Sequence, residues 1–267
     1  MERKKVKKMS RGGGSSRTQN GNKSVVAMEP GIGNKKTEAM EISKKQGMLF
    51  LETMGILFFQ VVVMVAVVLL LQNPKKYSLL LNGWFMFSII LVEFGFLFAI
   101  LFSRDSVPWS MFFFTCFSIL NGILMAPVYW FKENRKGVML AIASTLAIFV
   151  IMVGYGIYAY QNGFTMIGWG RYLFIALIAL LVGMLLQWGL VMSGVDVTPM
   201  NRILSVVGIV LFSMYIAYDT QLIFLGQRRS IGLKGKSALE QDNPVIFAVN
   251  LYIDLLNLFQ FMQSSSR

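Results

Sequence analysis

The sequence predicts an all-α integral membrane protein with seven transmembrane helices and a polar seventh helix at its centre. Of the 267 residues, 55% are hydrophobic, and they form long runs, unlike the short periodic stretches of a soluble core. A helix needs about 20 mainly apolar residues to cross ~30 Å of hydrocarbon. The last run carries several polar side chains, which protein or water must surround. That helix is therefore expected inside the bundle.

Seven runs are long enough to span, and most connections between them are short. Turn-forming and charged residues separate the runs, as at Asn73-Pro74 and Arg104-Asp105. The predicted spans are residues 48–71, 79–102, 107–131, 137–160, 171–192, 202–225 and 245–262. Residues 47–262 thus form the predicted transmembrane domain, which a short end at 263–267 follows.

The segment 1–46 differs in composition from the rest of the chain. It is rich in Lys, Arg, Gly, Ser and Asn, and it has too little apolar surface to offset the entropy of ordering, so we expect a disordered basic tail. Twelve of the 25 Lys and Arg residues lie within residues 1–45, which places the tail in the cytoplasm by the positive-inside tendency. The loops divide their basic residues evenly between the two sides, so the tail alone sets the orientation.

Composition also excludes several kinds of chemistry. The chain has no histidine, which removes His-ligated metal centres, Ser-His-Asp triads and histidine proton shuttles. The single cysteine, Cys116, cannot form an intrachain disulfide and is interpreted as a small core hydrophobe. The net charge of +12 comes mainly from the tail. We therefore expect neither an enzyme, nor a bound cofactor, nor a nucleic-acid partner.

Two aspartates lie inside the last two apolar runs, Asp219 in the sixth predicted span and Asp254 in the seventh. An ionised carboxylate near the bilayer centre costs roughly 2.5–3.5 kcal/mol, so such residues usually serve a function. Two carboxylates brought together in a poorly hydrated site share a proton and titrate as a coupled pair. Their oxygen atoms also suit transient binding of a hard cation such as Ca²⁺. Alternatively, nearby Asn, Thr or Tyr groups satisfy each aspartate separately, and the pair only specifies helix packing.

The second predicted span contains Glu93 in its interior and Arg104 at its end. Eleven residues make about three helical turns, so the two share a face and lie about 16 Å apart along the axis. Arg104 is either an anchor in the headgroups or a clamp that holds a carboxylate through two hydrogen bonds. Gln221, Asn250 and Asn257 are expected to be supporting polar groups of the same site.

Two blocks near the carboxyl end resemble the Bax-inhibitor-1 family, also called the TMBIM family. They are YIAYDTQ at 215–221 and LYIDLLNLF at 251–259. The resemblance implies a seven-helix fold around a central polar helix, and a pH-sensitive Ca²⁺ leak. It also implies that Asp219 and Asp254 form the pH-sensing dyad and bind Ca²⁺ transiently. By the same resemblance, Arg104 latches onto that dyad and Glu93 lies where the cation enters.

The long 227–243 loop and the short end at 263–267 depart from the eukaryotic cell-death suppressors of the family. We therefore expect a bacterial-type member in the plasma (inner) membrane, with the lipid bilayer and the calcium ion as its partners. The main alternative is a regulatory membrane protein that modulates a membrane protease or channel through the loop and the tail. A proton-coupled transporter of small solutes is a third hypothesis, because the same acids could relay protons.

Overall fold

The computed structural model describes residues 30–71, 73, 80, 82–129, 135–232 and 243–265, and the regular structure of these residues is entirely helical. The helices in chain order are α1 Pro30–Leu70, α2 Gly83–Phe102, α3 Val107–Met125, η2 Ala126–Tyr129, α4 Arg135–Gln161, η4 Ile167–Trp169, α5 Gly170–Met192, α6 Thr198–Gly232 and α8 Pro244–Ser265. Seven helical segments of the described chain are long and apolar enough to cross a membrane. The predicted fold class is confirmed.

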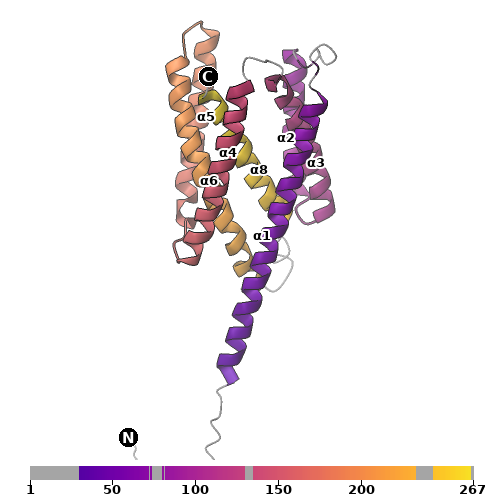
Figure 1. Cartoon of the computed structure of the whole chain (residues 1–267), viewed down its shortest axis with the longest axis vertical. Coiled ribbons are helices and arrows are strands. Elements are labelled where there is room, and N and C mark those ends of the chain that lie inside the picture. The colour runs from indigo at the N-terminus through magenta and orange to yellow at the C-terminus, as the bar shows by residue number, and fades with distance from the viewer. Residues whose placement is uncertain are drawn as a thin grey trace, which may run out of the picture.

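The spans run alternately in opposite directions because short connections join consecutive helices. The first span therefore starts at one end of the bundle, and the seventh finishes at the other (Figure 1). The first half of α1 projects beyond the other helices at the end where the chain begins (Figure 1).

Helix α8 lies at the centre of the bundle, as predicted. Of its most apolar 18-residue stretch, 61% is buried, against 6% for α5. Its main neighbours are α1, α3, α4 and α6, whereas α2 packs mainly on α3, and α5 mainly on α6. Helices α2 and α5 are therefore the outer helices of the bundle. The short loops 103–106 and 193–197 keep α2 and α5 beside their chain neighbours, on the outside of the bundle.

Aromatic contacts fix two opposite faces of α8. The Tyr252 ring meets the rings of Phe114 and Phe117 on α3, with centroids 5.3 and 6.0 Å apart. On the other face, the Phe261 ring stacks on Phe212 of α6 at 5.8 Å. A Cβ atom added at Gly208 would lie only 2.5 Å from the Phe261 ring. The absence of a side chain at Gly208 is thus what lets α6 and α8 approach so closely.

Local signals explain where some spans differ from the predicted bounds. The second begins at Gly83 instead of 79, because the Asn82 side chain accepts hydrogen bonds from the Trp84 and Phe85 backbone N–H groups at 3.0 and 3.4 Å. The third ends at Met125, since Pro127 has no N–H to continue the α-helical ladder.

Two helices extend into segments expected to be irregular. Helix α1 begins at Pro30, so part of the 1–46 tail is helical, and an ion pair between Glu41 and Lys45 (3.3 Å) supports that part. Residues 1–29 lie outside the described residues. Helix α6 continues to Gly232, seven residues past its predicted end and into the 227–243 loop.

Candidate functional site

Asp219 of α6 and Asp254 of α8 lie side by side at the contact between these two helices. Asp219 is 9% exposed and Asp254 5% exposed. Their carboxyl groups are within hydrogen-bonding reach of each other. A hydrogen bond between two carboxyl groups requires a proton between them, because an ionised carboxylate can only accept. We call these two residues the carboxyl pair.

Helix α4 packs closely on the stretch of α6 that contains Asp219. A Cβ atom added at Gly156 of α4 would lie 2.9 Å from the Ala217 carbonyl oxygen and 2.9 Å from Thr220 Cβ. The Thr220 hydroxyl, although next in sequence to Asp219, donates to the Ile216 carbonyl oxygen at 2.7 Å. Thr220 therefore bonds back to its own helix and makes this hydrogen bond away from Asp219, whose carboxyl group is close to Asp254.

Tyr215 is a further neighbour of the carboxyl pair. It lies one helical turn before Asp219 on α6, and its hydroxyl group interacts electrostatically with both aspartates. Its ring meets that of Tyr218, with centroids 6.5 Å apart. Tyr215 was not predicted to belong to the site, although its four-residue spacing from Asp219 places both residues on one face of the helix.

Arg104 lies at the end of α2, away from the carboxyl pair. Its side chain is exposed, and no ion pair joins it to either aspartate in the part of the chain that the structure describes. Its backbone carbonyl oxygen accepts a hydrogen bond from Asn243 Nδ2 at 2.7 Å. Asn243 precedes Asp254 by 11 residues, or about 16 Å of helix. In this conformation Arg104 does not make the contact expected of a latch.

Glu93 belongs to a second polar group, on the α3 side of α8. Its carboxylate lies beside the Asn121 side chain of α3, and it is close enough to Tyr252 to interact electrostatically. The hydroxyl of Tyr252 lies near that of Ser118, but among the described residues neither buried oxygen atom has a hydrogen-bond partner at full hydrogen-bond geometry. Glu93 and the carboxyl pair thus lie on different sides of α8.

The three residues expected to support the site do not contact it. Gln221 is fully buried, but its side chain accepts from the Met166 N–H at 2.7 Å and donates to the Phe164 carbonyl oxygen at 3.4 Å. It therefore holds the α4–α5 connection. Asn250 is exposed and Asn257 half-buried, and no hydrogen bond joins either to the aspartates among the described residues. Asn250 and Asn257 lie one turn before and one turn after Asp254 on α8, so a place on the same helical face is not enough to produce a hydrogen bond.

The fold and the carboxyl pair together define a class of protein. Seven spanning helices, with the polar seventh at the centre, form an integral multi-pass membrane protein, and this one carries two carboxyl groups side by side in its interior. Within the described residues, no cluster of three or more acidic or cysteine side chains could hold a resident metal ion. Two buried carboxyl groups this close together can share a proton and titrate as a coupled pair.

The sequence model of the family described as "Inhibitor of apoptosis-promoting Bax1" matches residues 46–264. The chain therefore belongs to the Bax-inhibitor-1 (TMBIM) family.

Similar proteins occur in bacteria, a virus and a mammal. An uncharacterized protein of Helicobacter pylori (strain J99) is 30% identical over 180 residues, which cover 66% of this chain and 67% of the relative. The Golgi anti-apoptotic protein of vaccinia virus (strain Lister) is 27% identical over 170 residues, covering 62% of this chain and 61% of the relative. Protein lifeguard 3 of Mus musculus is 23% identical over 161 residues, which cover 60% of this chain and 47% of the relative.

Proposed function

We propose that this protein is a pH-sensitive Ca²⁺ leak channel whose gate is the carboxyl pair. The observation that carries the proposal is the position of Asp219 and Asp254, which are buried and within hydrogen-bonding reach of each other between α6 and α8. Membership of the Bax-inhibitor-1 family supports it. The bacterial relatives support residence in a bacterial inner membrane.

The gate follows from the chemistry of two acids that share one proton. With the proton between them, the carboxyl groups hold α6 and α8 together. Without it, two negative charges lie within a few ångströms of each other in a medium of low dielectric constant, where they repel strongly. The helices then separate, and the exposed carboxylates attract and release Ca²⁺ through oxygen ligands. The leak therefore rises as pH rises.

Glu93 and Arg104 serve the same pathway in this proposal. Glu93 is the acidic side chain of the second polar group and receives the cation where it enters. Arg104, whose carbonyl oxygen is held by Asn243 at the start of α8, latches onto the carboxyl pair only after the α2–α3 loop moves inward. Arg104→Gln should then raise the leak at low pH, whereas an arginine that is only a headgroup anchor would leave it unchanged.

The test is Ca²⁺ flux into dye-loaded liposomes that contain the purified protein, measured from pH 5 to 8. The wild type should leak Ca²⁺ along a sigmoidal pH profile. Asp219→Asn and Asp254→Asn keep the side-chain shape but cannot ionise, so each should shift or abolish the pH midpoint.

Glu52→Gln is the matched control, because Glu52 is an exposed acid on α1, and its profile should equal that of the wild type. Absence of flux at every pH from folded wild-type protein would exclude the channel. The search would then turn to a protease or channel partner of the 227–243 loop.

A further inference from the structure

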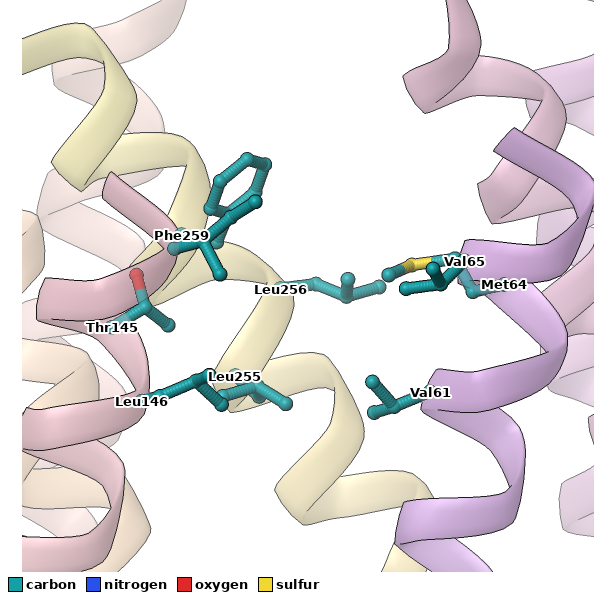
Figure 2. A pocket seen from close by; sticks show the side chains of 9 residues that line it. Val61, Met64, Val65, Thr145, Leu146, Leu255, Leu256 and Phe259 are labelled. Carbon is teal, nitrogen blue, oxygen red and sulfur yellow. The ribbon is translucent and has the colours of Figure 1, made fainter. Parts of the chain in front are cut away.

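A pocket of ≈180 Å³ lies between α1, α4 and α8 (Figure 2). Each of the three helices contributes three residues, and eight of the nine side chains are apolar. The lining residues are Val61, Met64, Val65, Ile142, Thr145, Leu146, Leu255, Leu256 and Phe259. The hydroxyl of Thr145 is the one polar group among these side chains. The lining is therefore almost entirely hydrocarbon.

The pocket connects the outside of the bundle with its central helix. At the outer rim, Val65 of α1 is 42% exposed and Leu146 of α4 is 49% exposed, so both belong to the surface that faces lipid. At the inner wall, Leu255 and Leu256 of α8 are buried. Figure 2 shows α1 and α4 on the two sides of the pocket, with α8 behind it. The pocket is thus a side opening through which α8 can be reached from the membrane.

The lining residues of all three helices lie at a similar depth in the membrane. Residues 61–65 lie five to nine positions before the end of α1, residues 142–146 lie seven to eleven after the start of α4, and residues 255–259 lie six to ten before the end of α8. At 1.5 Å per residue, all three estimates fall at about 7–16 Å from the same end of the bundle. One leaflet contributes about 15 Å of hydrocarbon. The opening therefore lies at the level of lipid acyl chains, in the leaflet on the side where α8 ends.

Water does not suit this pocket, but a hydrocarbon chain does. A buried water needs two to four polar partners, whereas the lining offers a single hydroxyl group. An apolar protein cavity of about 150 Å³ stays dry and binds a hydrocarbon such as benzene. If the pocket stayed empty, its lining atoms would lose their packing contacts. The bilayer supplies hydrocarbon directly at its rim.

We propose that an acyl chain of a membrane phospholipid enters between α1 and α4 and packs against α8 at Leu255, Leu256 and Phe259. The chain makes the central helix directly sensitive to the lipid around the protein. Leu255 follows Asp254 in sequence, so a chain in this position restrains the part of α8 that carries one member of the carboxyl pair. Only this last consequence rests on the proposed function.

The test uses full-length protein reconstituted in nanodiscs with a phospholipid that carries a diazirine halfway along one acyl chain. After photolysis, crosslinked peptides are identified by mass spectrometry. Crosslinks are expected on α8 at residues 255–259, and on lipid-facing residues such as Val150 (68% exposed). They are not expected on Leu251, which is fully buried on α8 and does not line the pocket.

Two variants of neighbouring residues separate entry through this opening from other routes. Val61→Phe fills the pocket and should abolish the α8 crosslinks while leaving those on Val150. Val62→Phe makes the same change at the adjacent residue, which is 47% exposed on the lipid-facing surface. This variant should keep the wild-type pattern of crosslinks. Thermal unfolding of both variants checks that they fold.

Three results would overturn the proposal. In the first, wild-type crosslinks occur on lipid-facing residues but not on α8. In the second, the α8 crosslinks persist in Val61→Phe. In the third, Leu251 is labelled as strongly as the pocket residues. None of these measurements involves Ca²⁺. A result that overturns lipid binding at the pocket would therefore leave the Ca²⁺ leak proposal untouched.

Discussion

Tyr252 and Asp254 are two positions apart on α8, and their side chains contact helices on opposite sides of it. Two residues turn a helix by about 200°, so Tyr252 packs on Phe114 and Phe117 of α3 while Asp254 meets Asp219 of α6. At this scale, a single helix separates the carboxyl pair from the second polar group. The two groups can therefore be altered independently.

Tyr252→Phe tests whether the buried hydroxyl has any structural role. Among the described residues the Tyr252 oxygen lies near Ser118 but has no partner at full hydrogen-bond geometry, and leaving a buried polar group unpaired costs about 1–3 kcal/mol. The variant keeps both ring contacts, so its free energy of unfolding should equal or exceed that of the wild type by up to about 1 kcal/mol. Thermal unfolding in detergent measures this. A melting temperature several degrees lower would show that the hydroxyl is bonded, for example through water to Glu93.

At the scale of elements, glycines set the distances between α6 and its neighbours. Gly208 admits the Phe261 ring of α8, and Gly156 of α4 brings that helix against the backbone of α6. Helix association in lipid depends on such close packing, because lipid tails are as apolar as the side chains they replace. The carboxyl pair is thus held where helices are in their tightest contact.

Gly156→Ala should destabilise the protein, whereas Gly154→Ala should not. A Cβ atom at position 156 would lie 2.9 Å from the Ala217 oxygen, whereas one at Gly154 meets nothing within 4 Å. Overpacking of this kind costs about 1–3 kcal/mol, while an unhindered Gly→Ala change in a helix gains up to about 1 kcal/mol. Unfolding midpoints of the two variants give the comparison. Equal effects would mean that α4 and α6 are not in close contact at Gly156.

At the scale of the whole molecule, seven spans place the two ends of the described chain on opposite sides of the membrane. The positive-inside tendency predicts that the basic tail and the start of the first span lie in the cytoplasm, and α8 should then finish outside. The packing of α8 against α1, α3, α4 and α6 joins the early and late parts of the chain into one body.

Cysteine labelling checks this arrangement in a Cys116→Ser background. Ser43 and Ser265 are both exposed and lie at the start of the first span and the end of the seventh. A membrane-impermeant maleimide should label Ser265→Cys in intact spheroplasts, and Ser43→Cys only after permeabilisation. Labelling of both positions from the outside would contradict the seven-span topology.

The sequence by itself determined the seven spans and the central place of the last one, and it predicted that Asp219 and Asp254 belong to the functional site. These features follow from the length and polarity of local runs, which any helix in a bilayer must obey. Motifs in the last two runs also led to the family. The ends of the helices were harder to predict from the sequence, because caps such as Asn82 shift them by a few residues.

Only the tertiary structure decided which polar residues meet. Gln221 lies two positions from Asp219, yet it bonds a loop 55 and 57 residues away. Arg104 was expected to share a helical face with Glu93, but it lies beyond the end of α2, where its carbonyl oxygen accepts a hydrogen bond from Asn243, 139 residues away in the chain. The rotation and tilt of each helix set these contacts, and both depend on packing against neighbours that no local pattern records.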